Sequence, residues 1–268
     1  MHLQKLKSSI PIILSTVAFR NHSLPEVLNL VSELGYSQVE IWERHLFDTP
    51  STDWPQILEA LTARGLSAPV VSPFLSFTRG AERLQQSQQA AAKAIEIAGL
   101  LGSTRFRVFT DVGKDGLSSA AATSDDWHVA VAEISRLCRQ NPQLLFVVET
   151  HPWTLADTVA STERLLNEVA EPNLKIIFQP IQIFLNGGLY DVLERLWPAI
   201  AHMHWHQMLQ DGGFGYLHEP GQVDFTALAS FLLSRRYHGT VTIEYCWRDI
   251  QIEKIRLDRN FLDQIFAR

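Results

Sequence analysis

A short run of the sequence alternates histidines with apolar residues. His202, His204 and His206 are separated by Met203 and Trp205. In an extended chain, residues two apart lie on the same face, so the three imidazoles point one way. Met203 and Trp205 suit packing under helices, so we expect the histidines to face away from the helices. Imidazoles placed there can bind a divalent metal or hold substrate oxygens.

Acidic and amide side chains end other apolar runs of this kind. Glu149, Gln179 and Glu244 each close a strand-like run. A histidine, two carboxylates and an amide oxygen form a set that Mn²⁺, Mg²⁺ or Zn²⁺ accepts. Taken singly, each residue could be a solvated loop side chain or a satisfied polar group of the core. Their occurrence at four successive strand ends favours a shared site, because buried carboxylates are costly unless they are paired.

The elements that must position these residues follow a repeated pattern of short β-branched runs and longer amphipathic segments. Eight runs predict strands: Ile12–Ser15, Gln38–Trp42, Ser67–Ser72, Arg105–Phe109, Leu145–Thr150, Lys175–Gln179, His202–His206 and Thr240–Tyr245. Apolar spacing predicts helices between them: Leu24–Leu34, Trp54–Arg64, Ala81–Leu101, Trp127–Gln140, Thr158–Val169, Leu189–Leu196, Phe225–Arg235 and Ile250–Phe266. Each unit takes about 33 residues, the size of one strand-helix step in a parallel sheet.

Eight such units predict an α/β fold, a single (β/α)8 TIM barrel domain over residues 1–268. The sequence contains no linker between units, and neither GxGxxG nor GxxxxGK[ST], the phosphate turns usual in open doubly wound sheets. We interpret the start, MHLQKLKSSIPIIL, as the lead into the first strand and not as a signal peptide. Ser23, Ser124 and Asp224 are expected to cap the helices that follow them. The active site of such a barrel lies at the C-terminal ends of its strands.

The composition restricts the partners. Apolar residues make up 46% and charged residues 19% of the chain, which is typical of a globular protein. The net charge of -6 argues against nucleic acid, and no apolar run approaches the roughly 20 residues of a membrane span. Two distant cysteines, Cys138 and Cys246, indicate a reducing compartment, so we expect a cytoplasmic protein. Aromatic loops at the barrel mouth are consistent with a homo-oligomer.

Two long segments resemble a known family. LSTVAFRNHSLPEVLNLVSELGYSQVEIWERH and ETHPWTLADTVASTERLLNEVAEPNLKI are similar to the xylose-isomerase-like TIM barrels, also called the sugar phosphate isomerase/epimerase superfamily. The resemblance extends over nearly the whole chain. This family holds sugar isomerases, epimerases and related lyases. The second segment is especially similar to bacterial 3-dehydroshikimate dehydratases, whose fifth strand reads ETHPNTL.

The resemblance implies a metal shell. The family places Glu, Asp, His and Glu at the ends of strands five to eight, and the matching residues are Glu149, Gln179, His204 and Glu244. With Gln179 in place of Asp the shell carries two negative charges, so it should hold a dication less tightly and leave it a stronger Lewis acid. The alternative is that no metal binds, and then one of Glu149 and Glu244 would have to stay protonated.

The resemblance also implies substrate-contacting residues. We expect these roles for Arg107, His151 and His206, and we add Gln182, Trp153 and Glu43 as further strand-end candidates. Gln182 stands where the family usually has a second His, and Trp153 replaces the Asn of the dehydratases. Arg107 could instead form a structural ion pair with Glu40 or Glu149.

These residues favour proton transfer next to a carbonyl of a small polyhydroxylated molecule: a sugar, a sugar phosphate or a cyclitol-like acid. Glu149 and Glu244, on opposite sides of the barrel mouth, would take and return the proton. The leading expectation is an isomerase or epimerase. The two alternatives are a 3-dehydroshikimate dehydratase-like lyase and a catalytically lapsed barrel that binds small molecules. A DNA-repair endonuclease would need more His and Asp ligands and a basic face. The glycine-rich stretch LQDGGFGYLHEPGQVD is expected to form a mobile loop.

Overall fold

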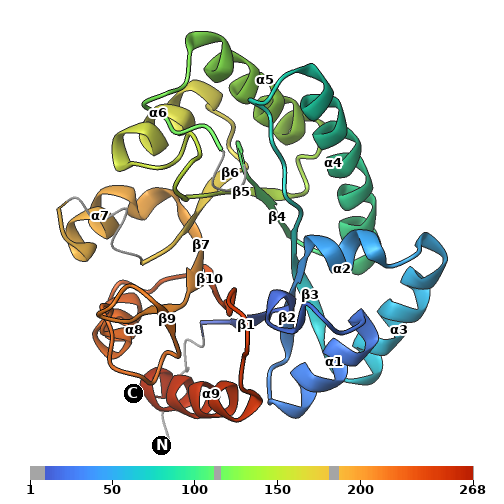
Figure 1. Cartoon of the computed structure of the whole chain (residues 1–268), viewed down its shortest axis with the longest axis vertical. Coiled ribbons are helices and arrows are strands. Elements are labelled where there is room, and N and C mark those ends of the chain that lie inside the picture. Colours follow the sequence, from blue (N-terminus) through green and yellow to red (C-terminus); the bar gives the residue numbers. More distant parts are fainter. Residues whose placement is uncertain (1–9, 112–115, 181–186, 268) are drawn as a thin grey trace, which may run out of the picture.

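A computed structural model of the chain describes residues 10–111, 116–180 and 187–267. Eight parallel strands close into a barrel in the order β1-β10-β7-β6-β5-β4-β3-β2 (Figure 1). The strands are β1 (Ile12–Ser15), β2 (Gln38–Trp42), β3 (Ser67–Ser72), β4 (Arg105–Val108), β5 (Leu145–Glu149), β6 (Leu174–Phe178), β7 (Ile200–Trp205) and β10 (Thr240–Ile243). The predicted TIM barrel is confirmed, and each predicted strand overlaps its observed counterpart.

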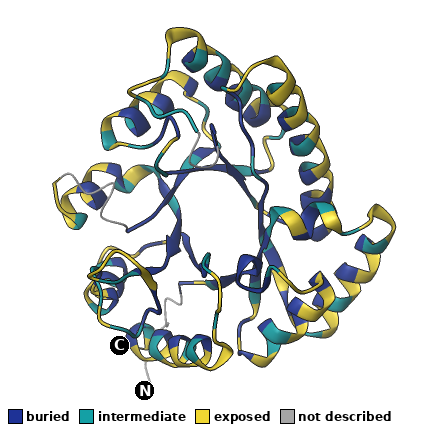
Figure 2. Cartoon of the chain, in the orientation of Figure 1, coloured by how far each residue is buried: buried dark blue, intermediate teal, exposed yellow. Residues whose placement is uncertain are grey.

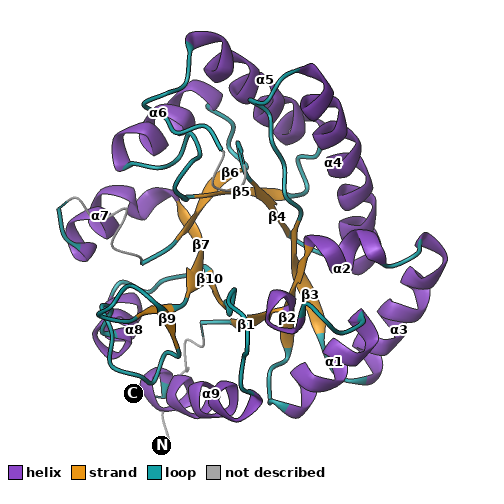
Figure 3. Cartoon of the chain, viewed as in Figure 1, coloured by secondary structure: helices purple, strands orange, loops and turns teal. Residues whose placement is uncertain are grey.

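Helices surround the barrel between consecutive strands (Figure 3). They are α1 (Leu24–Glu33), α2 (Glu43–Asp48), α3 (Trp54–Ala63), α4 (Ala81–Leu101), α5 (Ser124–Gln140), α6 (Val159–Val169), α7 (Leu189–Leu196), α8 (Phe225–Ser234) and α9 (Ile252–Phe266). Buried positions line the strands and the inner helix faces, while exposed positions lie on the outer helix faces (Figure 2). Burial of this apolar layer is the main force that holds the helices on the barrel. No helix of the described residues has the length and apolar character needed to cross a membrane.

The helix caps agree with the sequence at two sites and differ at a third. Ser23 and Asp224 precede α1 and α8 as expected, and Asp224 accepts a hydrogen bond from the Ala227 backbone N–H at 3.0 Å. The expected cap at Ser124 is wrong, because Thr123 caps α5. Thr123 and Asp126 bond reciprocally in a capping box, whereas a box that began at Ser124 would have Trp127, which has no acceptor, at its third position.

The segment expected to be a mobile loop contains a short hairpin and hydrogen bonds to the last helix, and its mobility stays a prediction. β8 (Gln207–Met208) pairs antiparallel with β9 (Phe214–Gly215), so the segment forms a short hairpin. Beyond it, the buried Asp258 of α9 accepts hydrogen bonds from the backbone N–H groups of Leu217 and His218, each at 2.9 Å. Gly212 lies in the turn of this hairpin and adopts a φ of 85°, a conformation that favours glycine.

Candidate active site at the barrel mouth

Three predicted residues meet around one imidazole nitrogen. Nδ1 of His204, on β7, lies 3.6 Å from an oxygen of Glu149 and 3.6 Å from an oxygen of Glu244. One ligand atom from each of the three residues falls within 4.8 Å of the others. The strand alternation explains this placement. Thr242 on β10 pairs with His204, and Glu244 follows two residues later on the same face of the chain.

The opposite nitrogen of the same ring faces a buried carboxylate. Nε2 of His204 lies 3.1 Å from Glu40, and Nε2 of His202 lies 3.1 Å from the same carboxylate. Ser72 donates a further, short hydrogen bond to Glu40. Sequence reasoning noted Glu40 only as a strand-end residue and as a partner that Arg107 could have. The available signal was its place between Val39 and Ile41, because a polar residue between two apolar ones on a strand faces the other side.

The two glutamates at Nδ1 have opposite acidities. Burial alone would raise the pKa of Glu149, but the charges of His204 and Arg107 outweigh burial and lower this pKa to about 2. Burial dominates at Glu244 and raises its pKa to about 7, with a further contribution from the charge of Glu149. Two carboxyl groups whose environments separate their pKa values are suited to different proton-transfer roles.

Gln179 lies in the same site, in contact with one of the carboxylates. Its buried amide donates a short hydrogen bond to Oε1 of Glu149, the oxygen that also approaches His204. In this arrangement the amide nitrogen, and not the oxygen, faces Glu149. A metal-ligand role for Gln179 through its amide oxygen stays a prediction. Gln182, the second glutamine singled out in the sequence, lies outside the described residues.

Arg107 forms an ion pair with Glu149, which is one of the two roles expected from the sequence. Its Nη1 lies 3.1 Å from Oε2 of Glu149, and its Nη2 donates to the Ser72 carbonyl at 2.9 Å. The guanidinium is buried and stacks over the rings of Phe74 and Phe109, 4.5 and 4.8 Å from their centroids. These contacts hold a cation rigidly at the edge of the site.

A cavity of about 400 Å³ opens above these groups. Its floor is polar, with Arg107, Glu149, Gln179, His206 and Glu244 among the lining residues. Much of the remaining lining is aromatic, from Trp42, Phe74, Phe109, Trp153 and Phe214, and His151 also lines the cavity. Of the expected substrate-contacting residues, Arg107, His151, Trp153 and His206 line the cavity. Glu43 does not line the cavity. Its carboxylate accepts a short hydrogen bond from the Phe74 backbone N–H.

Comparison with known proteins identifies the family. The sequence model of the xylose isomerase-like TIM barrels matches residues 28–265. The chain belongs to the xylose isomerase-like TIM barrel family. A 3-dehydroshikimate dehydratase of Bacillus anthracis is 29% identical over 220 residues, which are 78% of this chain and 76% of the relative.

Solved structures show the same fold at lower identity. A probable 3-DHS dehydratase of Bacillus anthracis superposes with a TM-score of 0.80 at 22% identity, over 94% of this chain and 98% of its own. D-allulose 3-epimerase from a Methylomonas species also has a TM-score of 0.80, at 17% identity, over 96% of this chain and 98% of its own. The similar proteins are thus enzymes, of lyase and epimerase type.

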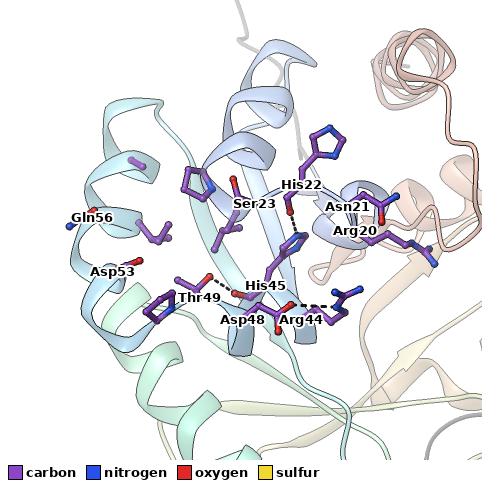
Figure 4. A pocket seen from close by; sticks show the side chains of 15 residues that line it. Arg20, Asn21, His22, Ser23, Arg44, His45, Asp48, Thr49, Asp53 and Gln56 are labelled. Carbon is purple, nitrogen blue, oxygen red and sulfur yellow. Dashed lines mark hydrogen bonds and ion pairs between the residues drawn. The ribbon is translucent and has the colours of Figure 1, made fainter.

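This xylose isomerase-like barrel has a second, larger cavity outside its mouth. It measures about 770 Å³ and lies between α1, α2 and α3 (Figure 4). His45, which lines it, has both ring nitrogens occupied, by Thr16 Oγ1 at 2.9 Å and by the His22 carbonyl at 3.0 Å. Arg44 pairs there with the exposed Asp48 at 3.4 Å. None of the predicted site residues that the structure describes lines this cavity, so the barrel mouth is the better candidate.

The donor set at the barrel mouth fits a divalent cation. Nδ1 of His204 is buried and finds no hydrogen-bond partner within the described part of the chain. The two carboxylate oxygens beside it are too far away for hydrogen bonds but converge on the same point. A nitrogen with two negative oxygens requires a positive charge among them, and either a proton on Nδ1 or a metal ion provides it. One imidazole and two carboxylates suit Mn²⁺, Mg²⁺ or Zn²⁺.

Proposed function

We propose that this protein catalyses proton transfer at a carbon next to a carbonyl of a small polyhydroxylated substrate, with help from a divalent metal. The observation that carries the proposal is the convergence of Glu149 and Glu244 on one imidazole nitrogen, with an oxygen of each carboxylate 3.6 Å from Nδ1 of His204. Glu149, Gln179, His204 and Glu244 would hold the metal. When bound, the metal would polarise the substrate carbonyl and so acidify the neighbouring C–H bond.

The residues of the site divide the work of the reaction. Glu149 is ionised at neutral pH and is ready to accept a proton from carbon. Burial raises the pKa of Glu244 to about 7 in the metal-free protein, and in the reaction its carboxyl group would return a proton to the other face of the substrate. Arg107 keeps Glu149 in its charged form through the ion pair at 3.1 Å. Return of the proton to carbon keeps the carbon skeleton intact and gives an isomerase or epimerase.

The cavity favours a ring-shaped or compact polyol. Its aromatic walls can stack on the apolar face of a sugar ring, while its polar floor holds the hydroxyl groups. His151 and His206 border the same space and could neutralise a carboxylate, a phosphate or a developing oxyanion. About 400 Å³ is in the range of sites for such small ligands.

A dehydratase reaction is the second candidate, and the 3-dehydroshikimate dehydratase relative favours it. The first step would be the same, loss of a proton from the carbon next to the carbonyl. The electron pair would then expel the β-hydroxyl, which would take a proton from Glu244 and leave as water. Trp153 replaces the Asn of the dehydratase motif, so the wall of the cavity differs at this position.

Solvent deuterium exchange tests the proposal. The Mn²⁺-loaded protein would be incubated in D₂O with D-allulose and, separately, with 3-dehydroshikimate. We expect deuterium incorporation or an epimeric product by NMR for the first, or an aromatic ultraviolet absorbance for the second. Glu244→Gln should reduce the rate by about 10²-fold or more. A wild-type protein that binds Mn²⁺ but exchanges no proton with either substrate class would support the binding-protein alternative.

A further inference from the structure

We infer that Glu40 is a positioning residue that holds the His204 imidazole with Nδ1 aimed at Glu149 and Glu244. The inference rests on the proposed function in one respect, that Nδ1 of His204 is the metal-binding nitrogen. Glu40 itself lines no part of the barrel-mouth cavity and belongs to β2, on the far side of the barrel interior from His204 on β7.

Glu40 is a fully buried carboxylate that accepts three hydrogen bonds. Its exposed fraction is 0%, and its donors are Ser72 Oγ, His202 Nε2 and His204 Nε2. A carboxylate is costly to bury unless such donors compensate it. The contact between Glu40 and His204 joins residues 164 apart in the chain, on strands β2 and β7, which are not neighbours in the barrel. If this position served packing alone, a leucine would stabilise the barrel more than a buried carboxylate does.

The bond to Glu40 determines which nitrogen of His204 is available above. An ionised carboxylate can only accept, so Nε2 must carry the proton that it donates at 3.1 Å. The lone pair of a neutral imidazole is then on Nδ1, which faces Glu149 and Glu244 at 3.6 Å each. The other tautomer would present an N–H group to the metal, and a flipped ring would present a C–H group. Carboxylates that orient a metal-binding histidine in this way are a general device.

His202 makes the arrangement rigid. Its Nδ1 bonds Thr240 Oγ1 at 2.5 Å, and its Nε2 shares the Glu40 carboxylate with His204. The two rings meet edge to face, with centroids 5.1 Å apart. Glu40 therefore has little freedom to leave its position, and His204 has little freedom to rotate.

Glu40→Gln tests the inference. The amide keeps the shape of Glu40 but is neutral and carries an NH₂ group that can donate, so it no longer forces the proton onto Nε2 of His204. We expect the Kd for Mn²⁺, measured by titration calorimetry with MnCl₂ on chelator-treated protein, to rise about 10- to 100-fold. Ser72→Ala is the matched control, because it removes the third donor and keeps both histidine bonds; its Kd should change less than about threefold. Circular dichroism of each variant establishes that the barrel is folded.

A measurement on the wild-type protein keeps the inference falsifiable if Glu40→Gln does not fold. Long-range ¹H–¹⁵N spectra of the Mg²⁺-loaded protein should show the His204 proton on Nε2. A proton on Nδ1 there, or an unchanged Mn²⁺ affinity in folded Glu40→Gln, would overturn the inference. Wild-type protein that binds no Mn²⁺ would instead contradict the proposed function. In that case the hydrogen bond from Nε2–H of His204 to Glu40 would be tested separately. Its signal should be present in the ¹H–¹⁵N spectrum of the wild type and absent from that of Glu40→Gln.

Discussion

At the scale of single residues, Gln179 has the clearest effect on the site. Its amide donates to the same oxygen of Glu149 that approaches His204. A carboxylate in its place would add a third negative charge to the shell and remove this donor. If the site binds a metal as proposed, Gln179 would stabilise the metal-free site and weaken its attraction for the dication.

Gln179→Asp should separate these two effects. We expect the affinity for Mn²⁺ to increase tenfold or more, about 1.4 kcal/mol, because one more charge faces the dication. In chelator the variant should unfold more easily, by about 1–3 kcal/mol, since Glu149 loses a buried donor. Calorimetry with MnCl₂ and urea unfolding measure the two quantities. Gln179→Asn is the neutral control, and an affinity equal to that of the wild type would contradict the charge argument.

At the scale of elements, α9 holds the segment that closes one side of the cavity. Asp258 accepts from two backbone N–H groups, from Nδ1 of His218 at 2.5 Å and from the Tyr245 hydroxyl at 2.7 Å. Lys254 of the same helix pairs with Glu219 at 2.6 Å. The hairpin thereby keeps Phe214 stacked on Trp247, with ring centroids 5.7 Å apart, at the edge of the cavity.

Asp258→Asn should loosen this segment. The amide offers one acceptor and two unwanted donors where four donors converge, so we expect a loss of at least about 2 kcal/mol of unfolding free energy. The backbone N–H groups of Leu217 and His218 should exchange faster with D₂O, which hydrogen-exchange mass spectrometry detects. Asp263→Asn on the exposed side of α9 is the control, with an expected change below about 0.5 kcal/mol. Equal exchange rates in both variants would show that Asp258 does not anchor the segment.

At the scale of the whole molecule, the barrel interior concentrates ionisable groups that are far apart in the chain. Burial and the charge of His204 lower the pKa of His206 to about 4. The pKa of His204 lies well above its usual range, because Glu40, Glu244 and Glu149 surround it and outweigh its burial. Folding therefore changes proton binding at neighbouring histidines in opposite directions, and stability depends on pH.

His206 should make the protein less stable in acid. As pH falls from about 6.5 to about 4, the unfolded chain takes up a proton at this residue and the folded protein does not. The free energy of unfolding should fall by up to about 3 kcal/mol over this range from His206 alone. His206→Gln should remove this part of the decrease in urea unfolding at pH 7 and pH 4.5 in chelator. His128→Gln, on an exposed position of α5, should leave it unchanged. A decrease of the same size in His206→Gln would refute the assignment.

Apolar spacing predicted the eight barrel strands and most of the helices, but it missed the short helix α2 and the hairpin of β8 and β9. Strands and helices depend on neighbours a few residues away, so apolar spacing predicts them well. The alternation of His202, His204 and His206 with Met203 and Trp205 correctly placed the three imidazoles away from the helices, and all three are buried. The cap of α5 was missed by one residue because two adjacent hydroxyls compete, and only Thr123 has a partner three residues on.

Which polar groups pair was decided by the tertiary structure. The sequence by itself determined that Glu149, Gln179, His204 and Glu244 stand at strand ends, since this follows from local pattern. That Asp258 fastens the segment after the hairpin depends on how α9 packs against that segment. That Glu40 bonds His204 across the interior depends on how the closed sheet staggers its strands. Stagger is a property of the whole barrel, because every strand must fit both neighbours at once, and no local spacing encodes it.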